Sequence, residues 1–135
     1  MRHTDVLSYI KMFPEVMKEQ PFIDALSNNR ESSLKYALLT KKRFIPGEEN
    51  MVDTAYYTHD VYNYLDVFPE ALDNQRMVEF VARHSIRRLA KYMGEVPHLK
   101  NAILDWVASK PRVAKEWARL IDGGQAHMEK RNEII

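Results

Sequence analysis

The chain repeats itself, and this internal similarity constrains its fold more than any other feature. The segment LSYIKMFPEVMKEQPFIDALSNN, which begins at Leu7, aligns with YNYLDVFPEALDNQRMVEFVARHS, which begins at Tyr62. Both contain a tyrosine, a Phe-Pro-Glu motif, a glutamine and an apolar cluster at the same offsets. A third copy, LAKYMGEVPHLKNAILDWVASK, begins at Leu89. Self-similarity at a fixed period indicates an array of related structural units.

The repeat unit is half of the offset between the first two copies, or roughly 28 residues. Five aromatic residues mark this spacing: Tyr9, Tyr36, Tyr64, Tyr92 and Trp117. We therefore predict about five units, near residues 4–30, 31–57, 58–84, 85–108 and 109–122, in a single domain that covers residues 1–122. Because they recur at the repeat period, the five rings are predicted to pack in the core and between units rather than to form an aromatic binding site.

Each unit is predicted to contain two short helices joined at a proline. Five residues with capping side chains precede the first helices: Thr4, Ser32, Thr58, Ser85 and Ser109. Pro14, Pro69 and Pro97 follow the unit's aromatic residue by five positions and should end the first helix, because proline cannot donate an amide hydrogen. The second helices are expected over residues 22–28, 77–84 and 102–110.

The second unit departs from this pattern. Pro46 follows Tyr36 by ten positions and precedes Gly47-Glu48-Glu49-Asn50, which together predict an exposed loop. The helix should restart near Met51 and run to Tyr57. Gly123-Gly124 should stop the last helix and leave residues 123–135 as a polar C-terminal tail.

Apolar residues in the fourth unit, such as Ile86, Leu89 and Met93, follow helical spacing, and no segment alternates as a half-buried strand would. The predicted fold class is therefore all-α, as a short α-solenoid or a compact bundle of about five two-helix repeats. Over residues 4–121 the arrangement is similar to α-solenoids as a class, which implies a shape and not an activity.

The composition of the chain argues against several classes of function. The chain has no cysteine and only four glycines, and none of its five histidines belongs to a zinc-protease motif. No phosphate-cradling loop is present either, so we predict a protein that is not an enzyme and uses no cofactor or metal. No apolar run approaches the ~18 residues of a membrane span, and residues 1–12 do not form a signal-peptide core. We expect a soluble, cytoplasmic protein without a membrane partner.

Charge is the feature most suggestive of a binding surface. Although the net charge is only +1, residues 76–119 contain ten Lys and Arg against four Asp and Glu. The predicted partner-binding residues are the cations placed on the outward faces of these helices: Arg83, Arg87, Arg88, Lys91, Arg112, Lys115 and Arg119. The alternative is that these cations form an ordinary solvated helix surface.

The predicted function is a small interaction module that docks on a larger protein as an adaptor, an assembly factor or an inhibitor. The alternative is a nucleic-acid-binding helical repeat whose basic surface tracks phosphates. The low net charge disfavours this second hypothesis, as does the absence of aromatic residues interleaved in a basic segment.

Overall fold

The structure is a computed structural model that describes residues 3–53 and 58–121. Within these ranges all regular structure is helical, and α- and 3-10 helices together hold 87% of the described residues. The all-α prediction is therefore confirmed. None of the described helices combines the length and the apolar character needed to span a membrane. The helix end expected at Tyr57, the Gly123-Gly124 stop and the C-terminal tail lie outside the described residues.

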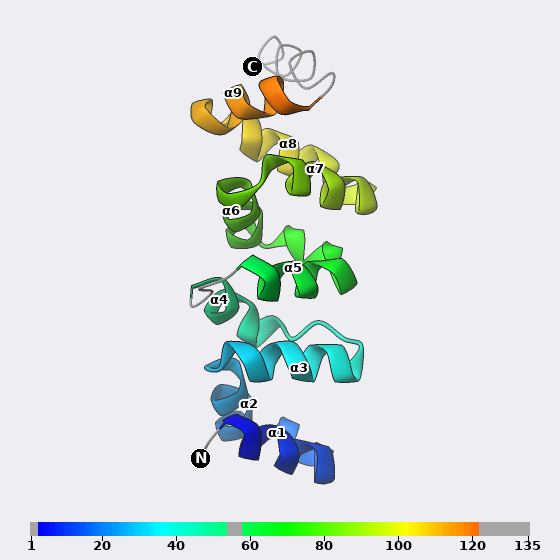
Figure 1. The fold of residues 1–135 in the computed structure, drawn as a ribbon. Helices are drawn as coiled ribbons and strands as arrows, with labels where there is room; N and C mark the ends of the chain where they lie inside the picture. The colour runs from blue at the N-terminus through cyan, green and yellow to red at the C-terminus, as the bar shows by residue number, and fades with distance from the viewer. Residues whose placement is uncertain (1–2, 54–57, 122–135) are drawn as a thin grey trace. The chain divides into compact units, whose positions relative to one another are not determined.

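The chain divides into two compact units, Met1–Phe68 (unit 1) and Pro69–Ile135 (unit 2), and the boundary falls inside the repeat predicted at residues 58–84. Unit 1 contains α1 (His3–Met12), the 3-10 helix η1 (Pro14–Lys18), α2 (Gln20–Ser27), α3 (Arg30–Thr40), α4 (Ile45–Asp53) and α5 (Thr58–Val67). Helix α3 contacts both α1 and α5, while α2 contacts α4 (Figure 1). Their shared core includes Leu26, Ala37, Met51, Val61 and Leu65, all with 0% exposure.

Unit 2 contains η2 (Pro69–Asp73), α6 (Gln75–His84), α7 (Ile86–Glu95), η3 (Pro97–Leu99), α8 (Lys100–Ala108) and α9 (Pro111–Leu120). Helix α7 contacts α6, α8 and α9, and α8 contacts α9. The side chains of Met77, Val81, Leu89, Val107 and Trp117 are buried in its core. Burying apolar side chains of this size stabilises the unit by about 1.5–3 kcal/mol each.

The proline joints lie where the sequence predicts them. The helices before Pro14, Pro69 and Pro97 each end two residues earlier, and each proline is the first residue of a 3-10 helix. Proline suits this position because the first amides of a helix have no partner within it. As a result, the order α-helix, 3-10 helix, α-helix occurs three times in the described residues.

The predicted helix starts are partly right. Ser85 caps α7, since its hydroxyl accepts a hydrogen bond from the amide of Arg88 at 3.2 Å. The predictions for Ser32 and Ser109 are wrong. Asn29 precedes α3 and caps it by accepting from the Ser32 amide at 2.9 Å. Ser109 follows α8, and its hydroxyl donates to the Trp106 carbonyl instead.

The remaining two predicted starts, Thr4 and Thr58, adjoin residues outside the described ranges, so their caps stay predictions. Thr58 is the first residue of α5, and Thr4 lies in the first turn of α1, which begins at His3. The second helices predicted at residues 22–28, 77–84 and 102–110 correspond to α2, α6 and α8, each of which begins two residues earlier. Helix ends are the least determined part of such patterns, because local capping groups compete over one turn.

The predicted loop after Pro46 is helical, which corrects both the loop and the restart near Met51. Helix α4 begins at Ile45, so Pro46 occupies its first turn, where no amide donor is needed. Gly47 is buried because it faces α3, where a Cβ atom in its place would lie 2.5 Å from the Ser33 Oγ. Glycine thus marks close packing of two helices here rather than a turn.

The five aromatic positions differ in burial. Tyr64 and Tyr92 have 0% exposure and Trp117 has 2%, as predicted for core residues. Tyr36 is half-buried, and Tyr9 is 41% exposed, so the core prediction is wrong for Tyr9. Tyr64 is covered by Phe44 and Glu48, which share hydrogen bonds with its hydroxyl, whereas the Tyr9 ring contacts the rings of Phe13 and Phe22 near the surface.

Candidate functional site

A cavity of about 740 Å³ opens in unit 2 between α6, the start of α7, α8 and α9. We call it the basic groove, because four cationic side chains line it: Arg83, Arg87, Lys110 and Arg112. Its volume falls within the range of roughly 300–1,000 Å³ that is typical of sites enclosing a compact ligand. The groove lies entirely within one compact unit.

Two helix starts contribute cations to the groove. Ser85 separates α6 from α7, which places Arg83 in the last turn of one helix and Arg87 in the first turn of the next. Lys110 is the N-cap residue of α9, and its side chain makes no capping hydrogen bond. Pro111 follows at the first helical position, which its fixed φ angle favours. Arg112 therefore also lies in a first turn.

Apolar side chains form the rest of the lining. Ile86, Trp106, Val113 and Leu120 contribute to it, together with Ala82. The Trp106 ring is half-buried, and its Nε1 is shielded from solvent without a hydrogen-bond partner among the described residues. The groove thus combines an apolar lining with positive charge, which is the usual composition of a binding site that orients an amphipathic ligand.

Two carboxylates also line the groove, and both have cationic neighbours. Glu79 lies 3.6 Å from Arg83. Glu116 accepts a hydrogen bond from Arg119 at 2.8 Å, and this bond lowers the pKa of the Glu116 carboxyl below its usual value. Each carboxylate therefore already pairs with a cation of unit 2.

The other cations of the groove are free of such pairing. Among the residues that the structure describes, the side chains of Arg87, Lys110 and Arg112 have no ion-pair or hydrogen-bond partner. All three side chains are exposed. The first turns of α7 and α9 add the partial positive charge of helix N-termini. The electrostatic field in the groove is therefore positive.

The structure brings some of the predicted site residues together and separates others. Arg83, Arg87 and Arg112 line the basic groove, whereas Arg88, Lys91, Lys115 and Arg119 do not. Arg88 donates to the Tyr92 hydroxyl at 3.2 Å, and the Lys91 Nζ lies 5.5 Å from the centre of the Tyr92 ring. Lys115 is exposed on α9, and Arg119 pairs with Glu116.

Sequence reasoning missed Lys110 and the apolar lining. Lys110 falls outside the helical stripes because it precedes α9, although its position before Pro111 is a recognisable helix start. Trp106 belongs to the apolar cluster of the copy that begins at Leu89, and such a cluster predicts packing rather than binding. Residues of α6 and α9 line the same groove as Trp106. This arrangement depends on tertiary packing, which local spacing does not predict.

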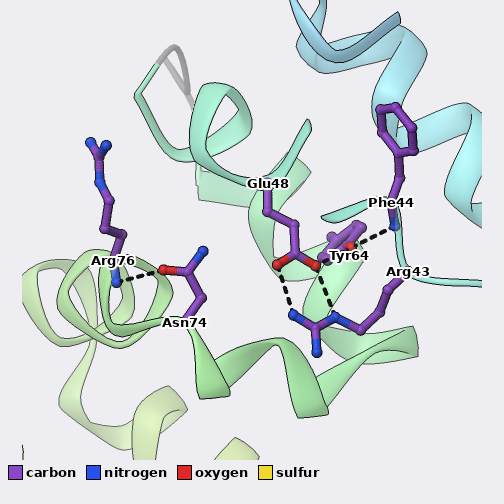
Figure 2. Close-up of polar contacts among 6 residues, drawn as sticks. All are labelled: Arg43, Phe44, Glu48, Tyr64, Asn74 and Arg76. Atoms are coloured by element: carbon purple, nitrogen blue, oxygen red, sulfur yellow. Dashed lines mark hydrogen bonds and ion pairs between the residues drawn. The ribbon is translucent and has the colours of Figure 1, made fainter. Parts of the chain in front are cut away.

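Unit 1 contains a second polar cluster, around the buried carboxylate of Glu48 (Figure 2). Arg43 donates to both Glu48 oxygens, at 2.8 and 3.0 Å, and the Tyr64 hydroxyl donates to Oε2 at 2.5 Å. The amide of Phe44 in turn donates to the Tyr64 hydroxyl at 3.1 Å. Burial and the bond to Glu48 raise the pKa of Tyr64. Each group has a partner, so the cluster joins α4 to α5 rather than presenting reactive groups.

The described residues thus form an all-helical structure whose second unit carries a basic, partly apolar groove. The described residues contain no group of three His, Asp or Glu side chains that could hold a metal ion. No protein family, curated protein or solved structure matches the chain.

Proposed function

We propose that this protein is a small non-enzymatic interaction module that binds another protein through the basic groove of unit 2. One observation carries the proposal: three unpaired cations, Arg87, Lys110 and Arg112, surround an apolar lining in a cavity of about 740 Å³. Exposed cations with this arrangement attract an acidic partner and fix its orientation, while the apolar surface supplies binding free energy. A cytoplasmic location remains part of the proposal.

The polar side chains of the groove support binding rather than catalysis. Ser85 has a structural role as the cap of α7. The His84 ring packs against Phe80, with 4.6 Å between the ring centres. A nucleophile would need a general base within hydrogen-bonding distance, oriented by a third group. The contacts of Ser85 and His84 support a structural role for both side chains instead.

We also propose that the chain is built from about five two-helix repeats, as a short α-solenoid or a bundle. The threefold occurrence of the order α-helix, 3-10 helix, α-helix supports this. A further similarity links the copies that begin at Leu7 and Tyr62. The Tyr9 and Phe13 rings lie 5.0 Å apart, as do those of Tyr64 and Phe68, and in each pair the second amide donates to the first carbonyl at 2.8 Å. Repeated helical units commonly serve as binding scaffolds.

Affinity capture from the native source tests the interaction. Wild type is compared with the groove variant Arg87→Glu/Arg112→Glu and with a control of equal charge change, Lys91→Glu/Lys100→Glu, whose exposed residues belong to unit 2 but not to the groove. We expect a protein that is retained by wild type and by the control and lost by the groove variant. Its recombinant form should then bind directly, with an association rate that falls as salt rises. Equal retention by both variants would contradict the proposal.

Nucleic-acid binding is the second candidate, favoured by the same three unpaired cations. The apolar lining and the carboxylates of Glu79 and Glu116 are poorly suited to a continuous phosphate backbone. We therefore rank it below protein binding.

A further inference from the structure

The composition of the basic groove narrows the chemistry of its ligand. The walls carry unpaired positive charge at two separate helix starts, Arg87 on α7 and Lys110 with Arg112 on α9. Cations from two helix starts favour a ligand with more than one negative charge. The partial positive charge at the starts of both helices has the same preference for anions.

The lining between these cations is apolar. Ile86, Val113 and Trp106 belong to α7, α9 and α8, so three helices contribute apolar surface to one cavity. Trp106 has the largest apolar side chain among them, and it is still partly exposed. A bulky apolar side chain of a ligand would remove this surface from water, and burying apolar area is favourable.

The two carboxylates in the groove disfavour a ligand whose anionic groups are closely spaced, such as a phosphate backbone. Glu79 and Glu116 lie among the lining residues, and their negative charges would repel phosphates that follow one another closely. Isolated carboxylates on a peptide can instead be placed opposite Arg87 and Arg112 and away from the two glutamates. Charge complementarity thus favours an acidic peptide segment over nucleic acid.

We infer that the basic groove binds a short acidic segment of the partner protein, with a bulky apolar side chain against Trp106 and carboxylates on either side paired with Arg87 and Arg112. This inference rests on the proposed function and specifies the occupant of the same site. The segment would be short, because the cavity of about 740 Å³ lies within one unit.

Synthetic peptides provide the probe. The test peptide is acetylated and amidated and carries a phenylalanine between two pairs of aspartates. Matched peptides replace the phenylalanine with serine or the aspartates with lysines. Trp106 and Trp117 are the only tryptophans, and Trp117 is buried in the core, so a change in tryptophan fluorescence on binding should come from Trp106. The variant Trp106→Phe should abolish the change.

We expect the test peptide to bind wild type and the control Lys91→Glu/Lys100→Glu with affinities that agree within about twofold. The variant Arg87→Glu/Arg112→Glu should bind at least about tenfold more weakly, since both paired charges become repulsive. The serine peptide should also bind about tenfold more weakly, and the lysine peptide should not bind. In the groove variant, Arg87→Glu and Arg112→Glu each place a carboxylate in the first turn of a helix, where the helix dipole favours it. This variant should therefore fold. Circular dichroism checks this.

Several results would overturn the inference. These are equal peptide binding by wild type and the groove variant, binding that does not depend on the phenylalanine, and tighter binding of an oligonucleotide with the same number of charges. The capture experiment separates the two proposals. If a captured protein requires the groove cations while the test peptide fails to bind, the proposed function stands and the occupant is wrong. If capture does not require those cations, the proposed function is wrong and this inference fails with it.

Discussion

At the residue scale, the environment of Glu48 is the most unusual in the described chain, because this carboxylate is only 1% exposed. Arg43 neutralises it with two hydrogen bonds, and the Tyr64 hydroxyl supplies a third. A buried charge persists only when it is paired and hydrogen-bonded. The three side chains therefore depend on one another, and the removal of one leaves a buried group without its partner.

The substitution Tyr64→Phe should lower the free energy of unfolding by about 2–3 kcal/mol, because it leaves the Phe44 amide without its acceptor and removes one of the two hydrogen bonds to Glu48 Oε2. Urea denaturation followed by circular dichroism measures the loss. Tyr9→Phe is the matched control, since Tyr9 is 41% exposed, and it should change stability by no more than about 0.5 kcal/mol. An equal effect of both substitutions would contradict the role of the Tyr64 hydroxyl.

Tyr64 should also make stability depend on alkaline pH. Its pKa is raised above the ordinary 10.0, first by burial and then by the hydrogen bond to Glu48. Above about pH 10 the unfolded chain loses this proton while the folded chain keeps it, so the folded form binds more protons and stability falls as pH rises. Below about pH 10 the contribution is fully present. The stability difference between wild type and Tyr64→Phe should therefore shrink by roughly 1 kcal/mol from pH 8 to pH 11. Urea titrations at both pH values measure this stability difference. A difference that stays constant would show that folding does not raise the pKa of Tyr64.

At the element scale, the first turn of α4 fits closely against α3. Gly47 allows this approach, since the Ser33 Oγ and the Phe44 ring leave no room for a side chain. Ser33 is itself held by a hydrogen bond from its hydroxyl to the Leu26 carbonyl at 2.8 Å. The nearest neighbour of Gly47 is therefore not free to move aside.

Two glycine substitutions with opposite outcomes test this packing. Gly47→Ala should destabilise the protein by about 1 kcal/mol or more, because overpacking outweighs the better helix propensity of alanine. Gly94→Ala on α7 meets no atom within 4 Å and should stabilise it by about 0.5–1 kcal/mol. Thermal or urea denaturation compares both with wild type. A stabilising effect at Gly47 would show that α4 lies further from α3.

At the scale of the whole molecule, charge separates along the chain. Unit 1 carries 8 Lys and Arg against 10 Asp and Glu, while unit 2 carries 12 against 9. The net charge of +1 therefore conceals one slightly acidic unit and one slightly basic unit. A field of this size can steer an acidic partner towards unit 2 at low salt, and it is weak compared with that of most nucleic-acid-binding domains.

Random duplex DNA should accordingly bind only weakly, with a Kd no tighter than about 10 μM at physiological salt. A gel-shift titration at two salt concentrations measures this for wild type and for the fourfold reversal of Arg87, Lys91, Arg112 and Lys115 to Glu. If the partner were nucleic acid, wild-type affinity would fall linearly in log salt, and the reversal would remove several units of the slope. That result would favour the second candidate function.

Much of the local structure could be predicted from sequence. Pro14, Pro69 and Pro97 act within one turn, so the joints after α1, α5 and α7 follow from their positions alone. Ser85 caps the adjacent helix by the same kind of local chemistry. Of the candidate site, helical spacing placed Arg87 and Arg112 in cationic stripes, because i, i+3 and i+4 positions share a face, and both line the groove; their role in binding stays a prediction.

The sequence alone therefore determined that the chain is helical, where several of its helices begin or end, and which helices carry positive charge. Only the tertiary structure decided that α4 continues through Gly47, that Glu48 is buried while Tyr9 is exposed, and that Lys110 and Trp106 line the basic groove. The physical reason is range: caps and prolines act on neighbouring amides, whereas burial depends on residues such as Tyr64, sixteen positions from Glu48, that only packing brings into contact.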